Sequence, residues 1–300
     1  MKKFYVTVNP HGGRQKGLRL LKQIRPFLES AGHQLDIHKT QSPGHARALA
    51  QQLNFNGFDG MIVIGGDGTM HEVLNGLLTR HDKRQLPIGL IPGGSGNSLM
   101  VDLGLADPLD AVKAIVMGHT RKFDVVELQH NLETPFAFNI IGWGLATDVG
   151  VQAEKWRWLG PARYTIASLF KVLRGVKPRP ATLKLDNQEI TDNFAFIIAC
   201  NTRYTSKMKI APKAKLNDGL VDVIVVRHGA SRFKLLTLLN RIYDGTHVQD
   251  PLVEYYLTSR LSLIPQEDEI LNIDGELGGS TPLELQVRPQ AFEMFAPHVD

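Results

Sequence analysis

The chain has 300 residues, of which 43% are hydrophobic and 21% charged, a composition that excludes a disordered chain and allows two globular domains. No stretch reaches the ~18 consecutive apolar residues of a membrane span, and a single cysteine, Cys200, excludes an internal disulfide, so we expect a cytoplasmic protein. The net charge of +4 and the pI near 9.1 suit an anionic partner, without choosing among nucleotides, nucleic acid and acidic membranes.

The first part of the chain alternates between strands and helices. The apolar patterns predict strands over 4–8, 33–40, 60–66 and 86–94, and helices over 17–32, 44–54, 70–80, from 97 and over 107–118. This alternation predicts a doubly wound, mostly parallel α/β domain over residues 1–124.

After Asp124 the pattern changes to short strands separated by Asp-Gly, Gly or Pro turns. The patterns predict strands over 123–128, 134–141, 181–188, 193–201, 220–228, 260–266, 269–274 and 283–289, with helical insertions over 154–174 and 231–245. We therefore expect an antiparallel β-sandwich-type domain over residues 125–300, whose last strand could return to the first domain. A boundary without a flexible linker predicts an active site in the cleft between the two domains.

Three loops of the first domain each follow an apolar strand and precede a helix. Glycine brings amide N–H groups close to a ligand, and a helix N-terminus adds partial positive charge, so such loops are typical of phosphate sites. A single loop of this kind could be only a tight turn, but three in succession favour phosphate binding. The candidate residues are Asn9, Pro10, Gly12 and Gly13; Gly65, Gly66, Gly68 and Thr69; and Gly94, Ser95, Gly96 and Asn97.

The second loop, "GGDGT", holds a carboxylate, Asp67. An acid would repel phosphate unless it binds Mg²⁺ or takes a proton from the acceptor hydroxyl, so Asp67 indicates chemistry. None of the loops contains the Gly-Lys-Ser/Thr of a P-loop, and the sequence has no His-Glu-x-x-His or Gly-x-Ser-x-Gly motif. A zinc enzyme and a serine hydrolase are therefore not expected.

These loops, "NPHGGRQKG", "GGDGT" followed by Glu72 and Asn75-Gly76, and "PGGSGN", resemble the catalytic domain of the diacylglycerol kinase and sphingosine kinase superfamily, which is distantly similar to NAD kinases. The resemblance runs over nearly the whole chain. It implies ATP and Mg²⁺ as cofactors and places Glu72 with the nucleotide-binding residues.

Two later motifs, "NDGLVDV" (217–223) and "NIDGEL" (272–277), agree with the resemblance, although each could be a plain turn between strands. The resemblance implies a structural cation site formed by Asp218 with backbone oxygens of Lys215 and Leu220. It also implies that Asp274 and Glu276 face the nucleotide loops across the cleft and complete the Mg²⁺ network.

The segment 139–169, especially "EKWRWLGPARY", is similar to the substrate region of sphingosine and ceramide kinases. The resemblance implies that Arg157 and Arg163 reach the ATP phosphates and that Glu154 orients them, although these arginines could simply be solvated. Asp148 matches a substrate-binding position of the family. Sphingosine kinases carry an aspartate two residues later, where this chain has Gly150, so we expect a neutral lipid rather than a sphingoid amine.

The expected function is that of an ATP- and Mg²⁺-dependent kinase that phosphorylates a primary hydroxyl of a neutral lipid of the diacylglycerol or ceramide kind. Asp67 is the first choice for the residue that accepts the hydroxyl proton, and Asp274 the second. Two alternatives stay open, a soluble NAD kinase and a regulatory nucleotide-binding module without catalysis. Nucleic acid is not an expected partner, and a homodimer is left open.

A lipid kinase without a membrane span must visit the bilayer. Trp156 and Trp158 lie beside Lys155 and Arg157, and aromatic and basic side chains together suit the headgroup region of a membrane. Either tryptophan could instead belong to the core. The helix expected over 231–245 is a second candidate for membrane contact, although its leucine stripe could also be core.

Overall fold

The computed structural model describes residues 1–129 and 135–297. The chain forms two compact units, one made of residues 1–124 with the segment that begins at Gln290, and one made of Val125–Pro289. Two strands, β5 (Thr120–Leu128) and β15 (Leu283–Phe295), continue from one unit into the other.

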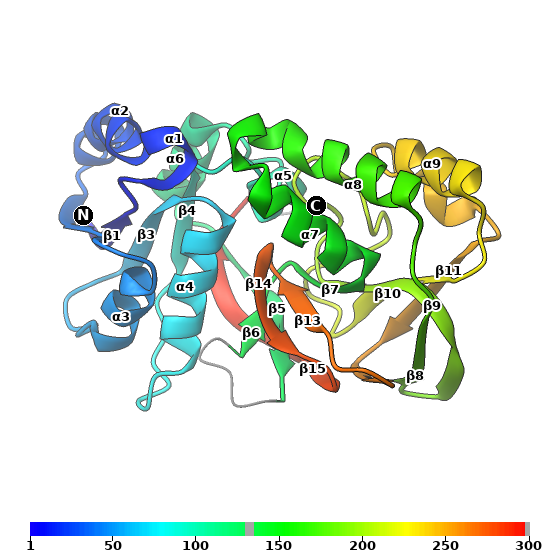
Figure 1. Ribbon diagram of the computed structural model, residues 1–300. Helices are drawn as coiled ribbons and strands as arrows, with labels where there is room; N and C mark the ends of the chain where they lie inside the picture. Colours follow the sequence, from blue (N-terminus) through cyan, green and yellow to red (C-terminus); the bar gives the residue numbers. More distant parts are fainter. Residues whose placement is uncertain (130–134, 298–300) are drawn as a thin grey trace. The chain divides into compact units, whose positions relative to one another are not determined.

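The first unit is built on parallel strands (Figure 1). Its further elements are β1 (Lys3–Val8), α1 (Gly12–Gln15), α2 (Gly17–Ser30), β2 (Gln34–Lys39), α3 (His45–Gln52), β3 (Gly60–Gly65), α4 (Asp67–Leu78), β4 (Ile88–Pro92), α5 (Ser98–Asp102) and α6 (Pro108–Met117). The strand order is β15-β4-β3-β1-β2, and each neighbouring pair is parallel.

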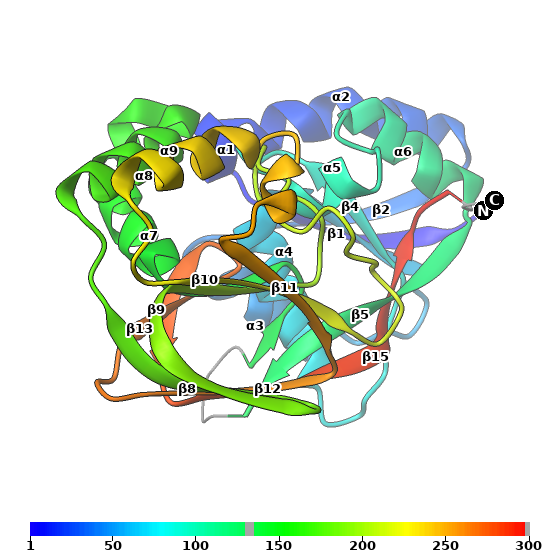
Figure 2. The same ribbon diagram turned by 90° about the vertical axis from the view of Figure 1, so that its right-hand side faces the viewer.

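Helices cover both faces of this sheet. In Figure 2, α2 and α6 lie on one side of β1 and β4, and α3 and α4 lie on the other. Every residue of β3 and β4 is buried, as a sheet covered on two faces requires. The expected start of α6 is confirmed, because Asp107 Oδ1 accepts a hydrogen bond from Leu109 N at 2.8 Å and Pro108 is the first helical residue.

The second unit is an antiparallel β-sandwich with helices attached. Its elements are β6 (Phe136–Ala137), β7 (Ile140–Gly144), α7 (Leu145–Lys155), η1 (Arg157–Ala162), α8 (Arg163–Arg174), β8 (Arg179–Leu185), β9 (Gln188–Cys200), β10 (Val221–Arg227), α9 (Arg232–Arg241), η2 (Thr246–Gln249), β11 (Val253–Thr258), β12 (Arg260–Pro265), β13 (Ile270–Ile273) and β14 (Glu276–Ser280). The predicted fold class, a parallel α/β domain followed by an antiparallel sandwich, is confirmed.

Strand β10 shows how the sandwich is filled. Val221, Val223 and Val225 point into the core shared with β7, β9, β12, β13 and β15, while Ile224 and Val226 belong to two clusters on the opposite face. Because both faces are covered, residues 223–226 of the strand are all apolar rather than alternating with polar residues. The single cysteine, Cys200, is buried and free on the neighbouring β9, and burial raises the pKa of its thiol.

Two sequence expectations in this unit are wrong. The helix expected from 154 begins at Leu145, and the helical segment is interrupted at Gly160, whose φ is 62°. The glycines of "WGLATDVG" suggest a turn, but Gly144 precedes the first helical residue and Gly150 is buried inside α7. The strand expected over 134–141 is divided between β6 and β7, and its first residue lies outside the described ranges.

A search of the helices in the described part of the chain finds none with the length and apolar character needed to cross a membrane.

Candidate functional site

The three glycine-rich loops follow β1, β3 and β4, which are adjacent parallel strands. Their carboxyl ends therefore lie at one edge of the sheet. In the sheet, β2 lies on one side of β1 and β3 lies on the other. The chain therefore crosses from β2 to the opposite side of β1, and the direction of the strand order reverses between β1 and β3. Ligands of open α/β sheets bind at such a switch point, so the loops lie where the fold favours binding.

Asn9 connects the first loop to the second. Its Oδ1 accepts hydrogen bonds from His11 N at 3.0 Å and Gly12 N at 2.9 Å, and its Nδ2 donates to Thr69 Oγ1 at 3.0 Å. A Cβ on Gly12 would lie 3.1 Å from the Asn9 amide nitrogen, so glycine lets the chain close over this side chain. Pro10 is half-buried between these residues, and Gly13 lies in α1.

The second and third loops pack backbone against backbone. A Cβ on Gly66 would lie 2.8 Å from the Cα of Gly94, and a Cβ on Gly94 would lie 2.6 Å from the Cα of Gly66. Gly93 N donates to Gly65 O at 2.7 Å, and a Cβ on Gly65 would lie 2.6 Å from Thr69 Oγ1. These glycines are therefore needed for the approach of two loops, a requirement separate from ligand contact.

The third loop is closed by Asn97, which has a φ of 53°. Its side chain accepts from Gly94 N at 2.9 Å and donates to Gly94 O at 3.1 Å. Asparagine tolerates this left-handed conformation better than most residues, so the conformation of the loop accounts for an asparagine at this position. Ser95 at the tip is exposed and Gly96 half-buried, which leaves this part of the loop accessible to a ligand.

Asp67 is the first residue of α4 and is half-buried. Its Oδ1 accepts a hydrogen bond from Ser98 N at 2.9 Å, and its Oδ2 accepts one from Ser98 Oγ at 3.2 Å. The residue before it, Gly66, has no side chain that could cap the helix, so the first turn of α4, which includes Gly68, presents backbone N–H groups beside the carboxylate. The structure thus places an oriented acid at a helix N-terminus, a position whose N–H groups favour anions.

Glu72 has a structural contact one turn further along α4. Its Oε2 accepts a hydrogen bond from Ala46 N, in the first turn of α3, at 3.0 Å. An acid at a helix N-terminus is stabilising, so this contact accounts for the residue without a nucleotide. Its role in nucleotide binding stays a prediction.

In the second unit, Asp274 lies in the tight turn between β13 and β14, with φ values of 53° for Asp274 and 94° for Gly275. Asp274 is 5% exposed, and its carboxylate accepts three backbone hydrogen bonds, from Phe138 N at 3.1 Å, Asn139 N at 2.8 Å and Ile140 N at 3.0 Å. The carboxylate thus fixes the chain between β6 and β7. Glu276, two residues later, is exposed.

Asp148, on α7, forms an ion pair with Arg179 at 3.0 Å. Arg179 is buried and also forms an ion pair with Glu269 at 2.7 Å. A buried guanidinium between two carboxylates joins α7 to β8 and to the residue preceding β13. Asp148 therefore has a protein partner, and a contact with substrate stays a prediction.

Glu154 and Arg163 form an ion pair of 3.3 Å that links the end of α7 to the start of α8. Arg163 also donates to the Tyr164 hydroxyl at 3.0 Å. The two residues that the resemblance assigns to nucleotide orientation are thus brought together. Arg157 belongs to η1, and its side chain lies outside the described structure.

The predicted cation site is a loop before β10. Asp218 is exposed and its Oδ1 accepts a hydrogen bond from Leu220 N at 3.2 Å, while Lys215 is exposed three residues earlier. Asp222 is buried below, accepts the hydroxyl hydrogen of Tyr255, and has its pKa raised to about 6 by burial and by the charge of Asp218. Cation binding by this loop stays a prediction.

The carboxylates near the glycine-rich loops suit a Mg²⁺ ion that is bound together with nucleotide phosphates. They suit a metal ion held by protein side chains alone less well. Within residues 1–129 and 135–297, no three His, Cys, Asp or Glu side chains gather as a metal-binding group. Mg²⁺ in kinase sites is commonly held by one or two carboxylates together with substrate phosphates and water. Asp67 lies beside the glycine-rich loops, where such an arrangement would need a carboxylate.

Two residues of these sites are missing from the sequence interpretation. Ser98 orients Asp67 from a different loop, and the only indication of this in the sequence is that Ser98 directly follows "GGSGN". Arg179 pairs with Asp148, 31 positions away, and with Glu269, 90 positions away, so no local pattern indicates it.

The comparisons with known proteins agree over both units. Residues 3–128 match the model of the "Diacylglycerol kinase catalytic domain", and residues 139–296 match the "YegS C-terminal NAD kinase beta sandwich-like domain". Sphingosine kinase 1 of Arabidopsis thaliana is 30% identical, over 92% of this chain and 68% of that protein. A diacylglycerol kinase of Bacillus subtilis is 28% identical, over 95% of this chain and 93% of that protein.

The structure itself is similar to a crystal structure of a diacylglycerol kinase from Bacillus anthracis. The TM-score is 0.82 at 25% sequence identity, and the superposition covers 99% of this chain and 97% of that one.

Proposed function

Since the chain belongs to the family of lipid kinases that includes the diacylglycerol and sphingosine kinases, we propose that it transfers the γ-phosphoryl group of ATP to the primary hydroxyl of a neutral lipid, with Mg²⁺. The observation that carries this proposal is the position of Asp67. An acid oriented by Ser98 lies at the N-terminus of α4, among glycine loops at the switch point of the sheet.

The phosphates of ATP would be held by the backbone N–H groups of the three loops and of the first turn of α4. This donor set provides fixed partial positive charge where the transferring group carries negative charge. When bound among the glycine-rich loops, Mg²⁺ would neutralise negative charge on the phosphates. The protein's contribution is then mainly positioning and electrostatic stabilisation.

Asp67 would accept the proton of the lipid hydroxyl as its oxygen bonds to the γ-phosphorus and the bond to ADP breaks. The geometry favours Asp67 over Asp274 for this role. Asp67 is half-buried, whereas Asp274 is only 5% exposed and its carboxylate accepts three backbone hydrogen bonds. A group held in this way is better suited to a structural task.

The names of the relatives divide between sphingosine and diacylglycerol kinases, so the headgroup is proposed from this chain's own residues. A Cβ on Gly150 would lie 2.9 Å from Asn272 Nδ2, and Asn272 Oδ1 accepts a hydrogen bond from Gly275 N at 2.9 Å. A carboxylate at position 150 would displace that amide. The absence of an acid at this position supports a neutral headgroup over a sphingoid amine.

The test is the Asp67→Asn variant, measured as turnover on diacylglycerol and ceramide in mixed micelles. An asparagine oxygen can still accept from Ser98 N, so ATP affinity should change little while kcat falls about 10²- to 10⁴-fold. The matched control is Asp110→Asn, which removes an acid that pairs with Lys113 on α6. Unchanged kcat in Asp67→Asn would refute the assignment.

A further inference from the structure

Asn272 of β13 is a buried polar side chain of the second unit. The residue is 7% exposed and pairs in the sheet with Gly142 of β7 on one side and Leu277 of β14 on the other. Its Oδ1 accepts a hydrogen bond from Gly275 N at 2.9 Å, which fixes the amide oxygen toward the turn between β13 and β14. The amide nitrogen, Nδ2, must therefore point away from this turn.

The amide nitrogen of Asn272 faces the middle of α7. A Cβ on Gly150 would lie 2.9 Å from Asn272 Nδ2 and 3.4 Å from Leu277 Cδ2. Neither the Cα of a glycine nor a methyl group can accept a hydrogen bond. Among the residues that the structure describes, Asn272 Nδ2 has no acceptor. Since a buried N–H group without an acceptor is uncommon and costly, this nitrogen suits an acceptor that arrives with a ligand.

Glycines on neighbouring elements make room for this amide group. A Cβ on Gly142 would lie 3.8 Å from the Cβ of Asn272, and a side chain at Gly150 would displace the amide nitrogen. The hairpin of β13 and β14 also borders open space, because a Cβ on Gly275 or Gly278 would meet no atom within 4 Å. A ligand can therefore approach this hairpin.

Diacylglycerol and ceramide share one chemical feature beside the reacting hydroxyl group. The carbon bonded to the CH₂OH group bears an acyl group, joined through oxygen in diacylglycerol and through nitrogen in ceramide, and the acyl carbonyl oxygen accepts hydrogen bonds. In sphingosine the same carbon bears an ammonium group, which can only donate. The NH₂ group of Asn272 complements the carbonyl oxygen and provides no acceptor for the ammonium group.

We propose that Asn272 recognises the acyl carbonyl of the neutral lipid, with Nδ2 donating a hydrogen bond to the carbonyl oxygen. The proposal rests on the proposed function for the identity of the lipid as the substrate. Asn272 is then a specificity-determining residue and takes no part in the transfer of the phosphoryl group. Because Gly150 and Leu277 make the surroundings of Nδ2 apolar, this hydrogen bond would be stronger than one exposed to water.

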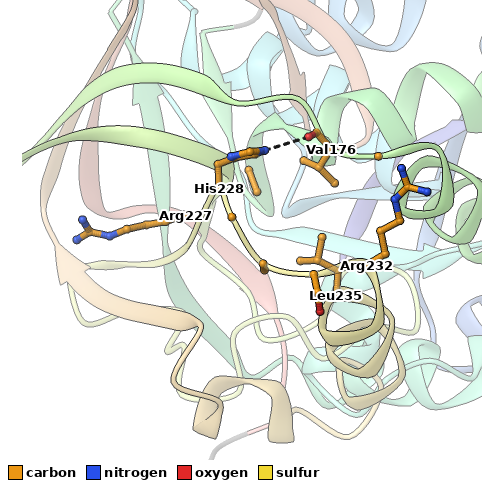
Figure 3. Close-up of a pocket in the computed structure, with 10 residues that line it drawn as sticks. Val176, Arg227, His228, Arg232 and Leu235 are labelled. Atoms are coloured by element: carbon orange, nitrogen blue, oxygen red, sulfur yellow. Dashed lines mark hydrogen bonds between the residues drawn. The ribbon is translucent and has the colours of Figure 1, made fainter.

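A pocket in the same unit has a different character. It has a volume of about 260 Å³ and lies between the C-terminal end of α8 and the N-terminal end of α9 (Figure 3). Its lining includes Arg232 and His228, and His228 Nε2 donates to Val176 O at 3.3 Å. The described lining residues lie in 175–176, 195 and 227–235, so none of them belongs to α7 or β13. Its basic groups suit an anion rather than an ester or amide, so we assign the carbonyl to Asn272.

The first test is calorimetric titration of the full chain, without ATP, with dihexanoylglycerol and with dihexylglycerol, the corresponding diether without carbonyl oxygens. The wild-type protein should bind the ester about tenfold more tightly. Asn272→Asp keeps an oxygen for Gly275 N but cannot donate to a carbonyl, so this variant should bind both lipids equally. The matched control is Asn187→Asp, which changes an exposed asparagine of the same unit and should keep the preference for the ester.

A kinase assay tests the opposite preference. Sphingosine and N-acetylsphingosine differ only in the acyl group on the nitrogen. The carboxylate of Asn272→Asp would pair with the ammonium group, so kcat/KM for sphingosine relative to N-acetylsphingosine should rise at least about tenfold over the wild-type ratio. A purely structural role of Asn272 would lower turnover on both lipids alike and leave the ratio unchanged. The wild-type values for dihexanoylglycerol and N-acetylsphingosine show which acylated lipid the protein prefers.

The outcomes separate this proposal from the proposed function. Equal binding of ester and diether by the wild-type protein would overturn the role of Asn272, and this comparison needs no variant. An unchanged ester preference in Asn272→Asp would overturn it as well. A phosphorylated lipid without any ester preference would leave the proposed function in place. An ester preference that Asn272→Asp abolishes, without phosphate transfer to any lipid, would support the carbonyl site and refute the proposed function.

Discussion

The Asp274→Asn substitution should destabilise the second unit, because the carboxylate organises the chain between β6 and β7. Oδ1 accepts from Asn139 N and Ile140 N, and Oδ2 accepts from Phe138 N. An asparagine can place its oxygen at one of these two positions only, and its NH₂ group then faces a backbone N–H at the other.

The variant therefore loses at least one hydrogen bond to a charged group, which contributes about 1.5 to 3 kcal/mol, and leaves a buried donor unsatisfied. We expect a total loss of about 3 kcal/mol in the free energy of unfolding, or a decrease in Tm of about 5 to 15 °C for a unit of this size. Urea unfolding and thermal unfolding of the full chain measure the two quantities.

The matched control is Asp268→Asn, an exposed acid in the same unit. It should change the free energy of unfolding by less than about 0.5 kcal/mol. If Asp274→Asn proves as stable as this control but loses turnover, the structural role would be refuted and Asp274 would replace Asp67 as the preferred proton acceptor.

Two further predictions concern the loops and the pH dependence of stability. In Gly94→Ala, the new Cβ would lie 2.6 Å from the Cα of Gly66, so the two loops must separate, and ATP affinity measured by calorimetry should fall about tenfold or more. Gly278→Ala meets open space and should leave ATP affinity unchanged; equal affinity in both variants would contradict the packing argument. The pKa of Asp222 is raised from 3.8 to about 6, so the folded state holds this proton while the unfolded state loses it, and stability falls as pH rises between about 4 and 6. In Asp222→Asn, urea unfolding should show a smaller fall over this range, and an identical pH profile would show that Asp222 ionises normally.

The motifs of the first unit were predictable from sequence because each lies within one short loop. Strand, glycine turn and helix follow one another in the chain, and parallel strands bring three such loops to one edge. The comparisons confirm the family resemblance that these motifs carry. The sequence does not reveal that Gly66 and Gly94 lie so close together that neither position can hold a side chain. Their contact depends on the register of β3 and β4.

The partners of the acidic residues were less predictable, for a physical reason. Asp274 binds backbone N–H groups 134 to 136 positions away. Because a residue of almost any type has a backbone N–H group, the sequence does not indicate these partners. Arg179 lies at the start of a β-strand and reads as an ordinary exposed base, although it is 7% exposed and pairs with two acids. The start of α7 was not predicted. Glycine is unfavourable inside a helix, but Gly150 allows α7 to pack against Asn272.

The central claim is that this protein phosphorylates a neutral lipid, and its most direct test is the transfer of labelled phosphate from ATP, with Mg²⁺, to a panel of lipids in mixed micelles. The panel is diacylglycerol, ceramide, monoacylglycerol and sphingosine, with NAD as the soluble control. We predict a labelled neutral lipid, no labelled NAD, and loss of label when Mg²⁺ is chelated. Labelled NAD without labelled lipid would contradict the claim, and preferential labelling of sphingosine would refute the argument from Gly150.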